Sequence, residues 1–131
     1  MNRETVEDLR AQLAAVSAER EHYRELYLKQ LEQMRKLERS GLRRHFSHVE
    51  VPPEKDEEAY RRLVEAAALD RTRTFMIGNS PRSDINPALR AGLRAVFIPH
   101  PHTWELEHEE IDLADERVTV IANFRTLRDI F

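Results

Sequence analysis

The sequence predicts an α/β fold in which a long N-terminal helix precedes part of a parallel β-sheet. Residues 5–40 contain neither glycine nor proline and repeat apolar side chains at helical spacing. Short apolar runs typical of buried strands lie further along the chain, at 48–51, 73–78, 94–98 and 117–121. Helical patterns accompany these runs, at 56–69, 84–92 and 124–130. Because alternating strands and helices favour parallel strands, we expect a helix over residues 1–40 and an α/β unit over residues 41–131.

The expected N-terminal helix carries an apolar seam at alternating spacings of three and four residues. Thr5 and Asp8 approximate a capping box at its start, and Ser40-Gly41 predicts its end. Arg20 and Gln30 are the polar positions of the seam, which comprises Val6, Leu9, Leu13, Val16, Arg20, Tyr23, Tyr27, Gln30, Met34 and Leu37. This spacing, kept over about five heptads, is typical of a coiled coil.

A helix of this length measures about 50 Å, and an α/β unit of about 90 residues cannot cover it on both sides. We therefore expect the chain to associate with itself through the seam. A parallel pair would bring Glu19 near Arg24, and Leu26 near Leu31, across the two helices. The alternative is a long amphipathic helix packed on its own domain.

Composition excludes several classes of protein. The net charge is −3 with 34% charged residues, so we expect no nucleic-acid partner. The absence of cysteine removes disulfides, thiolate catalysis and cysteine-based zinc sites. The sequence contains no apolar run long enough to span a membrane and no hydrophobic signal segment at its start. These features predict a cytoplasmic protein without a membrane partner.

The most informative segment is the strand at 73–78 together with the polar turn that follows it. The strand ends at Gly78, and the turn Asn79-Ser80-Pro81-Arg82-Ser83 leads to Asp84 at the start of a helix. A buried strand that delivers an acid to the edge of a sheet is how many α/β enzymes place a metal ligand or a catalytic carboxylate. The segment therefore predicts a functional site at the carboxyl edge of this strand.

Three segments together resemble the C-terminal half of a haloacid dehalogenase-like (HAD) phosphohydrolase, over roughly residues 33–131. They are Glu54-Lys55-Asp56, the loop from Gly78 to Asp84, and Gly92-Leu93-Arg94-Ala95-Val96-Phe97-Ile98-Pro99. The resemblance implies a partial Rossmannoid parallel sheet. It also implies that Lys55 is the family's motif III lysine, which neutralises the nucleophile and the substrate phosphate. The loop would be motif IV, with Asp84 and Asn79 as ligands of Mg²⁺, and Ser80 and His102 would lie on the phosphate or substrate side.

Two parts of the family pattern are missing from this sequence. The family's nucleophile is an aspartate in an Asp-x-Asp motif, and no Asp-x-Asp occurs in the chain. The motif II serine or threonine should precede Gln33, but neither residue type occurs between Ser17 and Ser40. The resemblance therefore implies a truncated phosphohydrolase that is inactive alone and whose nucleophile comes from a partner chain or belonged to a lost half. The alternative is a non-catalytic coiled-coil interaction protein that carries a HAD remnant.

The missing strands also leave the expected sheet incomplete. In the intact HAD-like fold, the first strand pairs with the motif IV strand and the second pairs with the third. The strand at 48–51 must then pair differently, pair with another chain or stay frayed, and the strand at 73–78 gains a free edge.

Simpler interpretations compete for each candidate residue. Ser83 or Asp84 could cap the helix that begins near residue 86. Lys55 could be an exposed lysine in the charged run 54–58, which we favour because no nucleophile remains for it to activate. A zinc site is conceivable from His100, His102 and His108, but we favour an extended loop in which Trp104 packs back onto the domain.

Overall fold

The structure is a computed structural model, in which residues 5–131 can be described. The chain divides into two compact units, one that ends at Pro53 and one that comprises Glu54–Phe131. None of the helices within residues 5–131 is long and apolar enough to cross a membrane. The expected fold class is confirmed, because a long N-terminal helix precedes an α/β unit with a parallel sheet.

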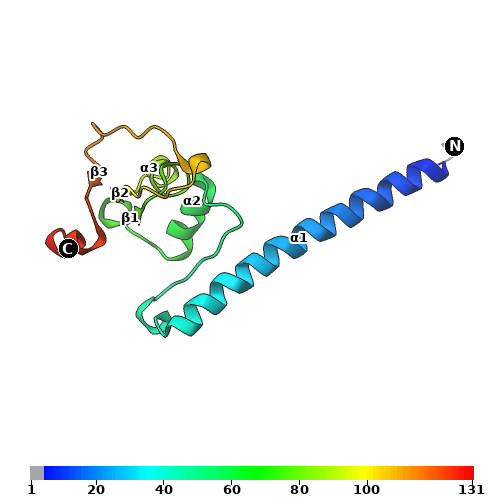
Figure 1. The fold of residues 1–131 in the computed structure, drawn as a ribbon, viewed down its shortest axis with the longest axis horizontal. Helices are drawn as coiled ribbons and strands as arrows, with labels where there is room; N and C mark the ends of the chain where they lie inside the picture. Colours follow the sequence, from blue (N-terminus) through cyan, green and yellow to red (C-terminus); the bar gives the residue numbers. More distant parts are fainter. Residues whose placement is uncertain (1–4) are drawn as a thin grey trace. The chain divides into compact units, whose positions relative to one another are not determined.

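The first unit is built on one long helix, α1 (Val6–Ser40), drawn in blue and cyan in Figure 1. Its first turn closes as a capping box: Asp8 N–H donates to Thr5 Oγ1 at 3.2 Å, and Thr5 N–H donates to Asp8 Oδ2 at 3.0 Å. The helix ends at Gly41, whose φ of 70° lies in the left-handed region that favours glycine. No residue of α1 is buried.

The chain leaves α1 through a short 3₁₀ turn, Arg43–His45, and reaches Pro53 without forming a strand. The expected strand at 48–51 is therefore wrong. A strand needs a neighbour for its N–H and C=O groups, and Pro52 and Pro53 supply no N–H donors at all. Val51 instead uses its carbonyl oxygen to accept a 2.8 Å hydrogen bond from Gln30 Nε2, so a polar position of the seam anchors this segment.

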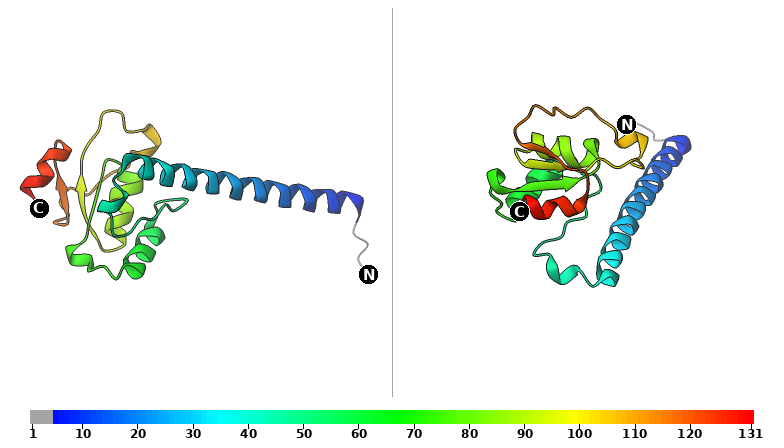
Figure 2. Two further views of the ribbon diagram at one scale, coloured as in Figure 1. Left: turned by 90° about the horizontal axis from the view of Figure 1, so that it is seen from below. Right: turned by 60° about the vertical axis from the view of Figure 1, so that its left-hand side comes forward.

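The second unit contains a three-stranded parallel sheet in the order β1 (Phe75–Gly78), β2 (Arg94–Phe97), β3 (Val118–Val120). Figure 2 shows the sheet from two further sides. Each strand lies within its expected range and is shorter than it. In the part of the chain that the structure describes, the outer edge of β1 has no strand beside it.

Two helices contribute to the core of this unit. The first, α2 (Glu57–Ala66), begins where the Asp56 side chain accepts the Ala59 N–H at 2.9 Å. It stops short of the expected end because the chain enters the left-handed region at Ala68, with φ 49°. The second, α3 (Asn86–Arg90), is the continuation of a π-helical turn, Pro81–Ile85.

Apolar side chains from α2, α3 and the strands form two clusters. One joins Tyr60 and Val64 of α2 to Ala88, Ala91 and Leu93, and the other joins Ile85 and Leu89 to Ala95. Burial of this kind contributes about 25 cal/mol per Å² of apolar surface.

The C-terminal segment winds as a 3₁₀ helix, Phe124–Asp129, rather than the expected α-helix. Its short span uses tight i→i+3 bonds, such as Thr126 N–H to Asn123 O at 3.2 Å. The segment ends with the Phe131 ring edge-on to the Phe75 ring, with 4.9 Å between centroids.

Candidate functional site

The turn after β1 holds the Asp84 side chain over the end of that strand. Ser80 Oγ accepts the Ser83 N–H at 3.0 Å, and Asp84 Oδ2 accepts the Ser80 N–H at 3.1 Å. The Tyr60 hydroxyl on α2 donates to the Ser83 carbonyl at 2.8 Å and so ties the turn to this helix. Burial strongly raises the pKa of Tyr60, and nearby Asp84 raises it further, so this hydroxyl stays a protonated donor.

Asp84 does not cap a helix, and neither does Ser83. The capping side chain is that of Ser80, and Ile85, which precedes α3, makes no side-chain cap. The cap expectation was wrong because the π-helical turn starts the helical path five residues earlier than the sequence pattern suggests. This leaves the Asp84 carboxylate free to face Lys55.

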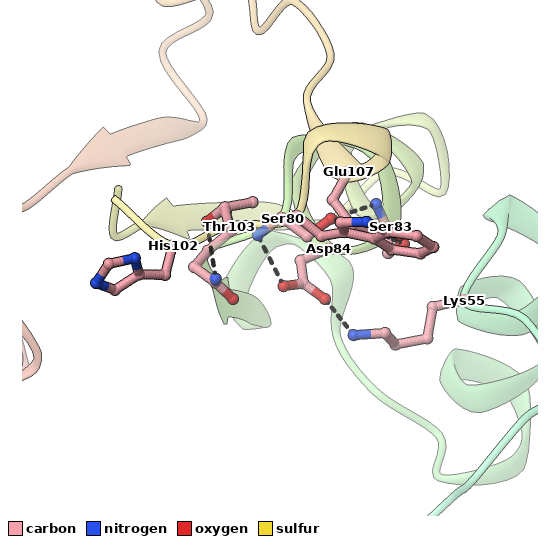
Figure 3. Close-up of a pocket in the computed structure, with 9 residues that line it drawn as sticks. Lys55, Ser80, Ser83, Asp84, His102, Thr103 and Glu107 are labelled. Carbon is pink, nitrogen blue, oxygen red and sulfur yellow. Dashed lines mark hydrogen bonds and ion pairs between the residues drawn. The ribbon is translucent and has the colours of Figure 1, made fainter. Parts of the chain in front are cut away.

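Asp84 and Lys55 form an ion pair at the carboxyl edge of the sheet, as Figure 3 shows. Lys55 Nζ lies 2.5 Å from Asp84 Oδ1. Asp84 is only 4% exposed, whereas the lysine side chain is 49% exposed. Lys55 is therefore not simply a lysine of an exposed charged run, because its ammonium compensates a buried carboxylate.

A pocket of about 350 Å³ surrounds this ion pair. All five residues that the sequence and the resemblance singled out line it, namely Lys55, Asn79, Ser80, Asp84 and His102. Asn79 Nδ2 donates to Thr103 Oγ1 at 3.0 Å, and the His102 ring lies on the far side of the pocket from Lys55 (Figure 3). Ser83, Thr103, Trp104 and Glu107 complete the wall.

Sequence reasoning missed Glu107, which lies in a short 3₁₀ turn, Glu105–Glu107, between β2 and β3. Its Oε2 accepts hydrogen bonds from both Ser80 Oγ and Ser83 Oγ. These two bonds hold the pKa of Glu107 below its usual range, and the charges of Arg82 and Lys55 lower it further. The available signal was weak, since Glu107 is one of several acids in a loop that leaves the same edge of the sheet.

The three histidines do not converge. The rings of His100 and His102 are 5.5 Å apart and tilted, while His108 Nε2 lies 3.2 Å from the Thr103 carbonyl oxygen. The expectation that Trp104 packs back onto the domain is wrong, because this side chain is 67% exposed at the pocket wall. Its neighbours Thr103 and Glu107 hold the loop through polar contacts, so the indole is not needed as an anchor.

The residues present do not by themselves form a site for Mg²⁺. Magnesium requires an octahedral set of oxygen ligands. Here one Asp84 oxygen is paired with Lys55 and the other with the Ser80 N–H. Within residues 5–131 no group of three or more His, Cys, Asp or Glu side chains could hold a metal ion. Further oxygen ligands would have to join Asp84.

Comparisons with known proteins agree with this fold. The family model described as HAD-hydrolase-like matches residues 53–125. The crystal structure of a haloacid dehalogenase-like family hydrolase from Xanthomonas campestris is similar, with a TM-score of 0.61 and 31% sequence identity. That match covers 71% of this chain but 38% of the Xanthomonas chain, and no curated protein matches. The family model spans more than half of the residues, and the chain belongs to the HAD-like hydrolase family.

Proposed function

We propose that this chain supplies one half of a HAD-like phosphohydrolase site and is inactive until an aspartate nucleophile is added to it. The observation that carries the proposal is the ion pair between Lys55 and Asp84 at the carboxyl edge of β1, inside a pocket. The Lys55 ammonium would stabilise negative charge on a phosphoryl group and on the nucleophile. Asp84 would become a ligand of Mg²⁺ once a second carboxylate and the phosphate contribute oxygens.

The edge of the sheet supports this proposal. β1 carries the Asp84 turn, and its outer edge is unpaired among the described residues. A strand that paired with this edge in parallel would end beside the same pocket, because the carboxyl ends of parallel strands meet at one edge. A nucleophilic aspartate at the end of such a strand would face Lys55.

A phosphatase assay tests the proposal. The purified chain, given p-nitrophenyl phosphate and MgCl₂, should release no p-nitrophenol above the blank, since covalent phosphoryl transfer requires a nucleophile that this sequence lacks. Adding the part of the Xanthomonas hydrolase that the match leaves out should restore turnover. That turnover should vanish with Lys55→Ala or Asp84→Ala. Turnover by the chain alone that either substitution abolishes would contradict the proposal.

A second candidate function is that of a coiled-coil interaction protein. The observation that supports it is the exposure of the α1 seam over its first three heptads. At least half of each apolar residue there is exposed, namely Val6, Leu9, Leu13, Val16, Tyr23 and Tyr27. The partner that fits best is a second copy of the chain in parallel. That arrangement places Glu19 opposite Arg24 of the other helix, and each apolar residue of the seam meets the same residue of the second copy.

Sedimentation tests this association. The chain should sediment as a dimer at tens of micromolar, and Leu13→Asp should convert it to a monomer, because burying an unpaired carboxylate in the seam is unfavourable. Ala18→Asp, on the opposite face of the helix, is the matched control. Because the chain has no cysteine, Val16→Cys should form an intermolecular disulfide in a parallel pair, whereas Ala18→Cys should not. A wild-type monomer at these concentrations would exclude self-association.

A further inference from the structure

Side chains of the Asp84 turn and its flanks form hydrogen bonds with the loop between β2 and β3. Four residues of the turn and its flanks take part besides Ser80. Asn79 Nδ2 bonds to Thr103 Oγ1 at 3.0 Å, and Arg82 Nη1 donates to the Leu106 carbonyl at 3.2 Å. Asn86 Nδ2 donates to Glu109 Oε2 at 2.7 Å and to the Glu110 carbonyl at 2.8 Å, and Ser83 Oγ donates to Glu107.

Glu107 accepts two of the hydrogen bonds between the turn and the loop, and Figure 3 shows it beside Ser80 and Ser83. One of its carboxylate oxygens accepts from two hydroxyl groups, those of Ser80 and Ser83. Ser80 is 7% exposed and Glu107 is half-buried, and hydrogen bonds to an ionised carboxylate are stronger than those between neutral groups.

Ser80 and Asp84 lie between Glu107 and Lys55 and connect them through separate hydrogen bonds. The Ser80 hydroxyl hydrogen points to Glu107, which leaves the oxygen to accept the Ser83 N–H. The Ser80 N–H donates to one Asp84 oxygen, and Lys55 donates to the other. Ser80 therefore contacts Glu107 through its hydroxyl and Asp84 through its backbone N–H, so the position of this residue couples the loop to the Asp84 carboxylate.

The same loop carries part of the pocket wall. Trp104 is three residues before Glu107, lines the pocket and is largely exposed, so its own packing does not fix it. We propose that Glu107 is a positioning residue, whose carboxylate fixes both the Asp84 turn and the loop that places Trp104 at the pocket. The proposal depends on the proposed function only in treating the Asp84 pocket as the site of reaction.

The full chain and three variants test this role without any activity measurement. Trp104 is the sole tryptophan, so differences in fluorescence anisotropy among variants that tumble alike report the mobility of its loop. Glu107→Ala should lower the Trp104 anisotropy and shift the ¹⁵N–¹H resonance of the Ser80 amide. Glu107→Gln should restore most of both signals, because its amide oxygen can accept from the two hydroxyls. Glu105→Ala, in the same 3₁₀ turn, is the matched control and should leave both signals as in the wild type.

A double substitution sharpens the test. Ser83→Ala should lower the anisotropy in the wild type but change little in the Glu107→Ala background, since the bond is already lost. If Glu107→Ala does not fold, the comparison of Ser83→Ala with Glu105→Ala decides. Anisotropy and a Ser80 resonance that match the Glu105→Ala control would overturn the proposal, whatever the phosphatase assay gives.

Discussion

Gly78→Ala should displace the Asp84 carboxylate, because the end of β1 and the Asp84 side chain touch. A Cβ atom added at Gly78 would lie 2.2 Å from Asp84 Oδ2, 2.6 Å from Cγ and 2.7 Å from Cβ. Ordinary contact begins near 3.4 Å. Because the Asp84 Cβ itself is too close, a new side-chain rotamer cannot relieve the overlap, and the backbone of the turn must shift.

The expected cost has two contributions. Forcing extra volume into a packed site typically destabilises by about 1–3 kcal/mol. Moving Asp84 also weakens its bonds to the Ser80 N–H and to Lys55, and an unsatisfied buried group costs about 1–3 kcal/mol more. The sum is on the order of 2–6 kcal/mol, which is a large share of the stability of a small domain, so the urea transition of the variant should move far down in concentration or vanish.

Urea unfolding followed by Trp104 fluorescence measures this cost, since the sole tryptophan lies in the second unit. Gly92→Ala is the control: its φ is 87° and the nearest side-chain atom is the flexible Arg71 Cδ at 3.1 Å, so the cost is backbone strain of about 1–2 kcal/mol. Combining Gly78→Ala with Asp84→Ala should cost less than the sum of the single changes. A Gly78→Ala midpoint equal to the wild type, or additive costs in the double variant, would refute the reasoning.

Three further predictions concern the second unit. Lys55→Ala should lower the free energy of unfolding of the second unit by about 1–3 kcal/mol, as measured in urea. This is less than the cost of breaking a fully buried ion pair, because the lysine side chain is half-exposed. An unchanged midpoint would argue against the ion pair. Because the pKa of Glu107 is lowered in the folded state, the ionised side chain contributes to the free energy of unfolding. This contribution is complete above the unfolded pKa of about 4.5 and is lost as the pH falls through the lower folded value. The stability difference between wild type and Glu107→Gln should therefore shrink in acid, and a constant difference from neutral to acid pH would contradict this. The open edge of β1 should leave the unit only about 2–4 kcal/mol stable, and a reversible calorimetric melt above about 65 °C would contradict that expectation.

Local patterns were sufficient to predict the elements that position the site. The seam and its caps predicted α1, and the apolar runs predicted β1, β2 and β3 within a few residues of their observed bounds. The turn from Gly78 to Asp84 was found because a glycine, a polar turn and an acid follow a buried strand. Lys55 was found by resemblance, and the structure brings it to Asp84 across 29 positions of sequence.

The missed features depend on contacts that no local pattern contains. Residues 48–51 have strand-like composition, but a strand forms only where a neighbour offers a ladder, and Gln30 satisfies Val51 instead. Glu107 resembles the other acids of its loop, and only the fold brings it to Ser80 and Ser83. Trp104 was expected to pack back onto the domain as part of an extended loop, yet polar neighbours hold that loop and leave the indole at the pocket wall.

One added strand could both complete the sheet of this chain and supply the nucleophile that we propose for catalysis. The outer edge of β1 is unpaired within the described residues, and the apolar side chains of β1 are only partly buried. A parallel strand added at this edge would pair its backbone groups, cover those side chains and end at the Asp84 pocket. The proposed nucleophile would belong at the end of such a strand, where Lys55 already neutralises a carboxylate. Binding of a complementing fragment should therefore raise the unfolding midpoint of the second unit and restore turnover together, since one strand would supply both.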